Sequence, residues 1–144
     1  MQNHLRVLLL LPVFGFAGCG GGDGSPASEL NTSADLSHEF VLGHGESIDV
    51  GPLSLEFLAL VDDSRCGIGG PGVCAWEGNG QILVNATNGR ASQVLILNSN
   101  PKFPTTAVFA GYVIELRRLD PQPAFTTPPA LDEYAATLLV NPQN

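Results

Sequence analysis

The sequence predicts an all-β domain: an antiparallel β-sandwich of the Ig-like or Greek-key kind, or a partly closed barrel, of seven to eight short strands. Short runs alternate apolar and polar residues with the period of two that a half-buried strand requires. Glycine and proline, 17 and 11 of the 144 residues, separate these runs. Helical spacing appears only weakly, near residues 131–136. The runs cover residues 39–42, 47–50, 53–61, 81–87, 92–97, 105–110, 112–119 and 134–140.

The first three runs are bounded by turn residues. The run 39–42 ends at Gly43-His44-Gly45, and the run 47–50 ends at Gly51-Pro52, a strong turn signal. The run 53–61 is the longest. We expect one apolar face along it, and its second half to be covered on both sides because the opposite face turns from polar to apolar. The predicted face consists of Leu53, Leu55, Phe57, Ala59 and Val61.

The later runs form hairpins and then close the domain. Asn88-Gly89, between the runs 81–87 and 92–97, is a hairpin signal, and we expect the second run to pair back with the first. Gly111 separates the runs 105–110 and 112–119, and in the second we expect Tyr112, Ile114, Leu116 and Arg118 on one face. The proline-rich stretch 121–129 cannot donate regularly to a ladder, so we expect a surface crossing or a covered edge.

The N-terminus has the order of an export signal. Arg6 precedes a short apolar run, residues 7–16, and small residues then lead to Cys19. The sequence Phe16-Ala17-Gly18-Cys19 resembles the lipobox of bacterial lipoproteins. The resemblance implies that residues 1–18 are a signal peptide, and that Cys19 carries acyl chains such as palmitate and anchors the protein to a membrane. Gly20, where some inner-membrane lipoproteins have Asp, favours the outer membrane, facing the periplasm or the exterior.

The remaining chain divides into a tether and one domain. Residues 19–37 comprise the lipidated cysteine and a flexible segment rich in glycine and serine, which spans about 20–25 Å on average. Residues 38–144 suffice for a single β domain. After Cys19 the chain has five basic side chains against fourteen acidic ones. This charge repels nucleic acid and anionic lipid, so we expect no nucleic-acid partner and attachment through the lipid alone.

The three cysteines fit the same interpretation. With Cys19 assigned to lipid, Cys66 and Cys74 remain as a pair in an oxidising compartment, where a disulfide is favoured. Such a loop closure stabilises a fold by about 2–3 kcal/mol in the chain-entropy model. The alternative, two free thiols that bind metal, lacks C-x-x-C spacing.

The densest local signal surrounds these two cysteines. Asp63-Ser64-Arg65-Cys66, followed by Cys74-Ala75-Trp76-Glu77-Gly78, resembles a D-S-R-C…C-x-W-x-G signature of small, largely uncharacterised bacterial envelope proteins. The segments 117–121 and 134–138 match the same group in kind. This chain departs from the group in its longer, glycine-rich cysteine loop, where we expect a proline just after the first cysteine. The resemblance implies a fold and no particular activity.

Two interpretations of this loop remain open. In the first, Arg65, Trp76, Glu77 and residues 67–72 present a rigid surface to a partner or ligand. In the second, which small exported domains favour, the loop is a structural staple. Trp76 then covers the disulfide as a plug of the core, and Arg65 forms an exposed ion pair with Asp62 or Asp63.

Other kinds of site have weaker support. Asp62, Asp63 and Glu77, with His38 or His44, offer ligands for Ca²⁺ or Zn²⁺, but no metal-binding spacing is present, and we expect these side chains on the solvated surface. A hydrolytic enzyme is the last hypothesis, because a G-x-S-x-G elbow is missing. We therefore expect no catalytic residues and no cofactor. The sequence favours a lipid-anchored binding or structural accessory module whose partner is an envelope protein or an extracellular ligand.

Overall fold

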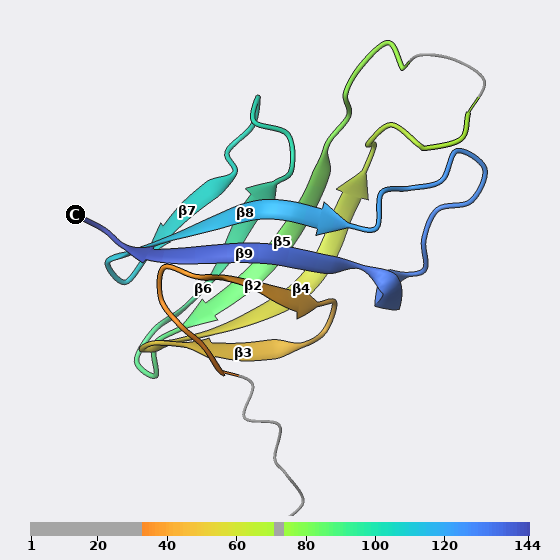
Figure 1. Cartoon of the computed structure of the whole chain (residues 1–144). Coiled ribbons are helices and arrows are strands. Elements are labelled where there is room, and N and C mark those ends of the chain that lie inside the picture. Colours follow the sequence, from red (N-terminus) through yellow and green to blue (C-terminus); the bar gives the residue numbers. More distant parts are fainter. Residues whose placement is uncertain (1–32, 71–73) are drawn as a thin grey trace, which may run out of the picture. The chain divides into compact units, whose positions relative to one another are not determined.

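The computed structural model describes residues 33–70 and 74–144 (Figure 1). They form nine strands and one short 3₁₀ helix, η1 (Leu131–Glu133). The strands are β1 (Ser33–Ala34), β2 (Glu39–Gly43), β3 (Ser47–Val50), β4 (Leu53–Asp63), β5 (Gly80–Thr87), β6 (Ser92–Asn98), β7 (Thr106–Phe109), β8 (Tyr112–Asp120) and β9 (Ala135–Pro142). In this part of the chain, no helix has the length and apolar character needed to cross a membrane.

The strands form the two layers of a β-sandwich. One sheet has the order β1-β3-β4-β5-β6 and the other has the order β2-β9-β8-β7. All pairs are antiparallel except β1 with β3. Each sheet ends in two edge strands, so the domain adopts the sandwich rather than the partly closed barrel. The predicted all-β class is confirmed, and Asn88-Gly89 lies in the turn between β5 and β6, where Gly89 has φ +78°.

The core lies between the two sheets and is made by alternate residues of nearly every strand. In β5, for example, Ile82, Val84 and Ala86 are fully buried, and the residues between them are partly exposed. This alternation is the physical basis of the sequence pattern, because successive side chains of a strand point to opposite faces. The largest fully buried side chains include Phe57, Leu42, Leu53, Leu55, Ile82, Leu97, Ile114 and Leu138.

Bulges overturn two of the predicted faces. In β4 the register shifts after Phe57, so that Leu60 pairs with Ile82 and packs against the core, while Val61 is 52% exposed. The prediction of one continuous face along β4 is therefore wrong beyond Phe57. In β8 the register shifts between Leu116 and Arg118, and Arg118 lies on the outer face instead of the inner one. A bulge adds one residue to one strand, which reverses the alternation beyond it.

Strand β1 lies within the segment expected to be a tether. Ser33 and Ala34 pair with Asp49 and Val50 of β3, and Leu36 packs against the core. The folded domain therefore includes residues 33–37, and the predicted start at residue 38 is too late. Residues 1–32, including the lipobox and Cys19, lie outside the described residues.

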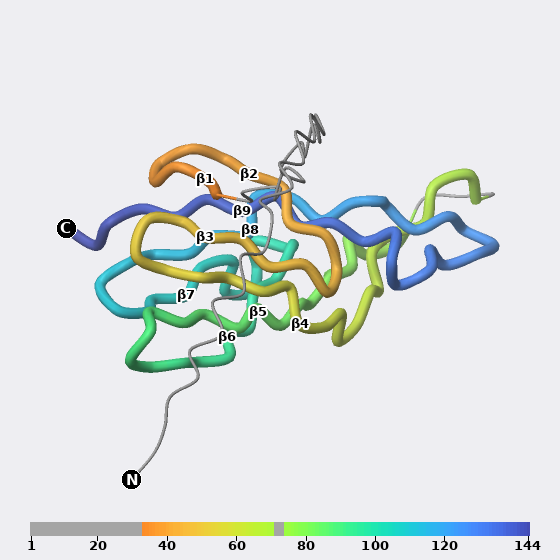
Figure 2. The backbone as a smooth tube through the Cα atoms, turned by 90° about the horizontal axis from the view of Figure 1, so that it is seen from below, coloured from red at the N-terminus to blue at the C-terminus, as the bar shows by residue number. Residues whose placement is uncertain are grey.

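The sandwich has two distinct ends. At one, which we call the turn end, lie the tight turns 51–52, 88–91 and 110–111, together with β1 and the C-terminus. At the other, which we call the loop end, lie the long connections 64–79, 99–105 and 121–134. The described parts of the first loop, residues 64–70 and 74–79, and the loop 121–134 extend side by side, away from the C-terminus (Figures 1 and 2). Strand β4 connects the two ends, and its 11 residues span about 30 Å.

Candidate functional site

The loop end contains every residue of the predicted binding surface that the structure describes. The loop that carries them begins where β4 ends at Asp63 and returns to β5 at Gly80. Cys66 and Cys74 form a disulfide with Cα atoms 6.0 Å apart, as expected. Residues 71–73, which include the end of the predicted 67–72 surface, lie outside the described residues.

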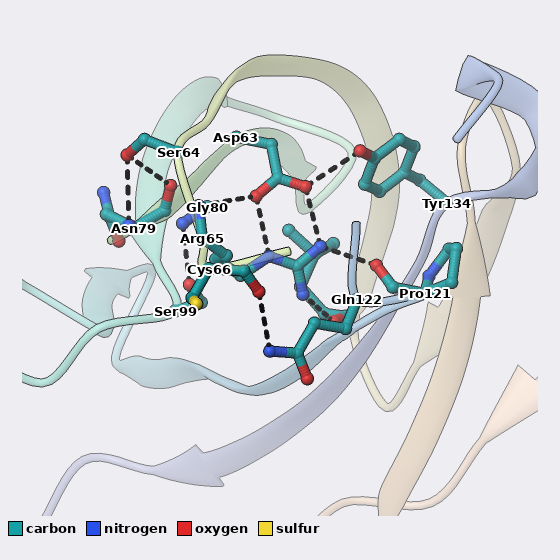
Figure 3. Close-up of polar contacts among 11 residues, drawn as sticks. Asp63, Ser64, Arg65, Cys66, Asn79, Gly80, Ser99, Pro121, Gln122 and Tyr134 are labelled. Carbon is teal, nitrogen blue, oxygen red and sulfur yellow. Dashed lines mark hydrogen bonds and ion pairs between the residues drawn. The ribbon is translucent and has the colours of Figure 1, made fainter. Parts of the chain in front are cut away.

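Arg65 is the centre of a buried polar cluster (Figure 3). Its Nε and Nη2 each donate to one carboxylate oxygen of Asp63, both at 2.8 Å. Its Nη1 donates to the carbonyl of Leu119, and Nη2 also donates to the carbonyl of Pro121 at 2.6 Å. The Tyr134 hydroxyl donates to Asp63 at 2.8 Å. We call these residues, Asp63, Arg65, Leu119, Pro121 and Tyr134, the Arg65 cluster.

The Arg65 cluster corrects the expectation of an exposed ion pair. Only 12% of the Arg65 side chain and 7% of the Asp63 side chain are exposed. Burial alone would raise the pKa of Asp63, but the hydrogen bonds from Arg65 and Tyr134 outweigh it and hold the pKa below its ordinary value. Burial, together with the bond to Asp63, raises the pKa of Tyr134 to about 12. The Arg65 guanidinium therefore links Asp63 to the main chain at Leu119 and Pro121 inside the domain, rather than serving as a contact for a partner.

The Arg65 cluster joins three segments that are far apart in the sequence. The D-S-R-C segment supplies Asp63 and Arg65, residues 117–121 supply the Leu119 and Pro121 carbonyls, and Tyr134 donates to Asp63. The resemblance drew attention to each part separately, but no local pattern indicates that main-chain carbonyls 54 and 56 residues away are the partners of Arg65.

Two further sets of contacts fix the loops to one another. Ile68 and Ala124 form a parallel bridge, with hydrogen bonds from Ile68 to Pro123 and from Phe125 to Ile68. The Gln122 side chain donates to the Cys66 carbonyl at 3.0 Å. A Cβ on Gly67 would lie 2.7 Å from the Cα of Phe125, so glycine permits this close approach of the two backbones.

A buried asparagine network, which the sequence reasoning missed, supports the base of the loop. Asn100, 5% exposed, donates to the Gly78 carbonyl at 2.6 Å, and its backbone N–H donates to the side chain of Asn79. Asn79 in turn donates to Asn98 at 2.8 Å. Buried amides that find partners make a rigid base. Asparagine is common in loops, and its sequence position alone does not distinguish a buried network from an exposed turn.

Trp76 lies on the surface. It is 53% exposed, so the prediction that it plugs the core is wrong. It lines an open groove of about 640 Å³ with both cysteines, Glu77 and Lys102. Glu77 forms an exposed ion pair with Lys102 at 3.4 Å, which contributes little to stability. Of the predicted binding residues, Trp76 and Glu77 are therefore exposed, whereas the Arg65 side chain is largely buried.

Two further exposed apolar residues of the loop end are Ile68, which belongs to the predicted 67–72 surface, and Phe125, which the sequence reasoning missed. Ile68 is 61% exposed and Phe125 is 60% exposed, and their backbones are joined by the bridge between the two loops. Large apolar side chains held on a rigid support are typical of protein interaction surfaces. The loop end thus offers apolar contact area at fixed positions.

The predicted metal ligands do not assemble. Among residues 33–70 and 74–144, no three His, Cys, Asp or Glu side chains gather as a metal site requires. The Asp63 carboxylate is bound within the Arg65 cluster, whereas Asp62 and Glu77 are exposed. His38 is exposed and contacts the Leu36 carbonyl, and the His44 ring packs edge-on against Phe57.

Comparisons with known proteins add no relative to this description. Family models, curated proteins and solved structures were each compared with the chain, and none of them matches it.

Proposed function

We propose that the protein is a lipid-anchored binding or structural accessory module of the bacterial cell envelope. In this proposal Cys19 holds the chain in the outer membrane, and the loop end contacts an envelope protein or an extracellular ligand. Ile68, Trp76 and Phe125 supply the contact area. The Arg65 cluster and the disulfide keep the supporting loops in place.

One observation carries this proposal: β1 and the loop end lie at opposite ends of β4. Ser33 pairs beside the turn 51–52, where β4 begins, and the loop 64–79 starts where β4 ends. A chain tethered through residues 19–32 therefore joins the domain about 30 Å from the exposed apolar residues. This arrangement directs the loop end away from the point of attachment, as presentation to a partner requires.

The lipid anchor is tested with the full chain produced in a bacterial host that is fed an alkyne analogue of palmitate. We expect the wild-type chain to incorporate the label and to sediment with outer membranes. Cys19→Ser should lose both properties while Cys66 and Cys74 stay bonded. A labelled Cys19→Ser protein, or an unlabelled wild-type protein, would contradict the anchor.

The interaction surface is tested in intact envelopes with a photo-reactive amino acid in place of Trp76 or Phe125. The matched control carries the same group in place of Arg90, an exposed residue at the turn end. We expect one discrete adduct, with the same partner from both loop-end positions and none from the control. Equal adducts from both ends, or none from either, would remove the support for the loop end as the contact surface.

A further inference from the structure

A second candidate site lies on the outer face of the four-stranded sheet, apart from the exposed apolar residues of the loop end. A trough of about 420 Å³ runs over β9. Glu39 and Val41 of β2 form one wall, and Arg117 and Arg118 of β8 form the other. Thr137 of β9 lies between the walls, because it pairs with Val41 on one side and with Arg118 on the other.

The bulge in β8 places two consecutive arginines beside this trough. In a regular strand they would point to opposite faces, but both are exposed, and both line the trough. They are two of only six basic residues in a chain of net charge −8. A pair of cations is thus concentrated at one place on an acidic protein.

The hydrogen-bond donors of these arginines are only partly used. Arg117 donates through Nε to Glu39 at 3.1 Å and through Nη1 to Glu115 at 2.8 Å. Arg118 donates through Nε to Asp120. Within the described part of the chain, Nη2 of Arg117 and both terminal nitrogens of Arg118 have no hydrogen-bond partner. The trough therefore has an excess of donors and favours a ligand that supplies acceptors.

Thr137 provides an independent indication. The residue is only 7% exposed, and its Oγ1 is the one buried side-chain oxygen or nitrogen without a hydrogen-bond partner in residues 33–70 and 74–144. Buried hydroxyl groups nearly always have a partner, and an unpaired one requires an explanation. An oxygen of a bound group, placed over Thr137, would supply it.

We propose that this trough binds a small oxyanion, the carboxylate or phosphate group of a ligand. The two guanidinium groups match the planar, multiple acceptors of such a group, and the Thr137 hydroxyl donates to one of its oxygens. Glu39 and Asp120 exchange their arginine contacts for water as the anion enters, since about half of each side chain is exposed. Binding is modest and weakens with salt. It needs neither the lipid nor the loop-end partner.

The test is a titration of the full chain, held in an uncharged detergent, with sodium phosphate and separately with sodium acetate. Backbone amide resonances are followed against sodium chloride of equal ionic strength. We expect saturable shifts at Arg117, Arg118 and Thr137. A stronger response to phosphate identifies a phosphate ligand, and a stronger response to acetate identifies a carboxylate. No saturation, or an equal effect of chloride, would refute the site.

Three variants make the test specific. Arg118→Gln and Thr137→Val should each weaken binding about tenfold or more, the effect of losing one hydrogen bond to a charged group. Arg90→Gln, which removes an exposed arginine at the turn end, should leave the affinity unchanged. Thr137→Val should also raise the Tm of the ligand-free protein, because it removes the unpaired hydroxyl. Wild-type affinity in Thr137→Val, or an equal loss in Arg90→Gln, would overturn the proposal.

Discussion

Replacement of Arg65 by methionine tests whether the Arg65 cluster holds the loop end together. Methionine keeps much of the apolar stem but removes the charge and all the side-chain hydrogen bonds to Asp63, Leu119 and Pro121. The Asp63 carboxylate then stays buried without a counter-ion. Breaking a buried pair in this way costs about 3–5 kcal/mol. Since Arg65 is not completely enclosed, we expect about 3 kcal/mol, a large share of the stability of one domain.

The free energy of unfolding is measured by urea denaturation with the disulfide intact, followed by circular dichroism. Trp76 is already exposed and would report poorly on unfolding. The matched control is Arg118→Met, which removes an exposed arginine paired with Asp120 and should cost at most about 1 kcal/mol.

A double-mutant cycle then isolates the interaction energy between Asp63 and Arg65. In the variant that combines Asp63→Asn with Arg65→Met, neither charge is left buried alone, so its loss of stability should be smaller than the sum of the two single losses. We expect a coupling energy of about 2 kcal/mol. A coupling below about 0.5 kcal/mol, the usual error of additivity, would refute the buried-pair reasoning.

Three further predictions concern the loop end and its surroundings. Because the pKa of Tyr134 in the folded protein is raised to about 12, the stability that this residue contributes is complete below its ordinary pKa near 10 and is lost as the pH rises towards 12. The difference between alkaline absorbance titrations of the wild type and of Tyr134→Phe should show a transition near pH 12. A transition near pH 10 in this difference would contradict the prediction. Gly78→Ala should lower the Tm clearly more than Gly89→Ala, because both glycines have positive φ but only a Cβ at Gly78 would collide with the backbone. Equal decreases in Tm would contradict the predicted clash. Replacing Cys66 and Cys74 together by serine should lower the free energy of unfolding in urea by about 2–3 kcal/mol, and the circular dichroism spectrum should still be that of a folded β domain. A fully unfolded variant would contradict this prediction and show that the fold depends on the disulfide.

The strands were predictable because their signal is local. Ile82, Val84 and Ala86 of β5 are buried on the face that the sequence pattern indicates, whereas β6 alternates in burial although its apolar run 94–97 does not alternate in residue type. The bulges in β4 and β8 were not predictable, because one extra residue in the pairing reverses the face of the residues that follow, and no residue type marks the place. Leu58 is apolar like Phe57 and Ala59, and Arg117 is followed by a second arginine. Strand β1 was missed because two residues are too few to show a period.

For the candidate site, too, some features were predictable from the sequence and others were not. The disulfide follows from counting cysteines, and Glu77 is exposed, as acidic residues usually are. The burial of Arg65 and the exposure of Trp76 both run against residue type. Each depends on which groups the distant parts of the chain bring next to the side chain, and no local sequence pattern reveals that. Leu119 and Pro121, in particular, contribute main-chain carbonyls, which every residue carries.

The sequence separations within the loop end set an order in which its contacts can form as the chain enters the oxidising compartment of the proposed function. Cys66 and Cys74 are 8 residues apart and can join as soon as both have emerged. The Leu119 and Pro121 carbonyls follow Arg65 by 54 and 56 residues, and Tyr134 follows Asp63 by 71. Strand β2 likewise has to wait for β9, its partner in the second sheet. The cysteine loop can therefore close on an unfinished sandwich, whereas the Arg65 cluster needs Tyr134 and the second sheet needs β9, which follows it directly.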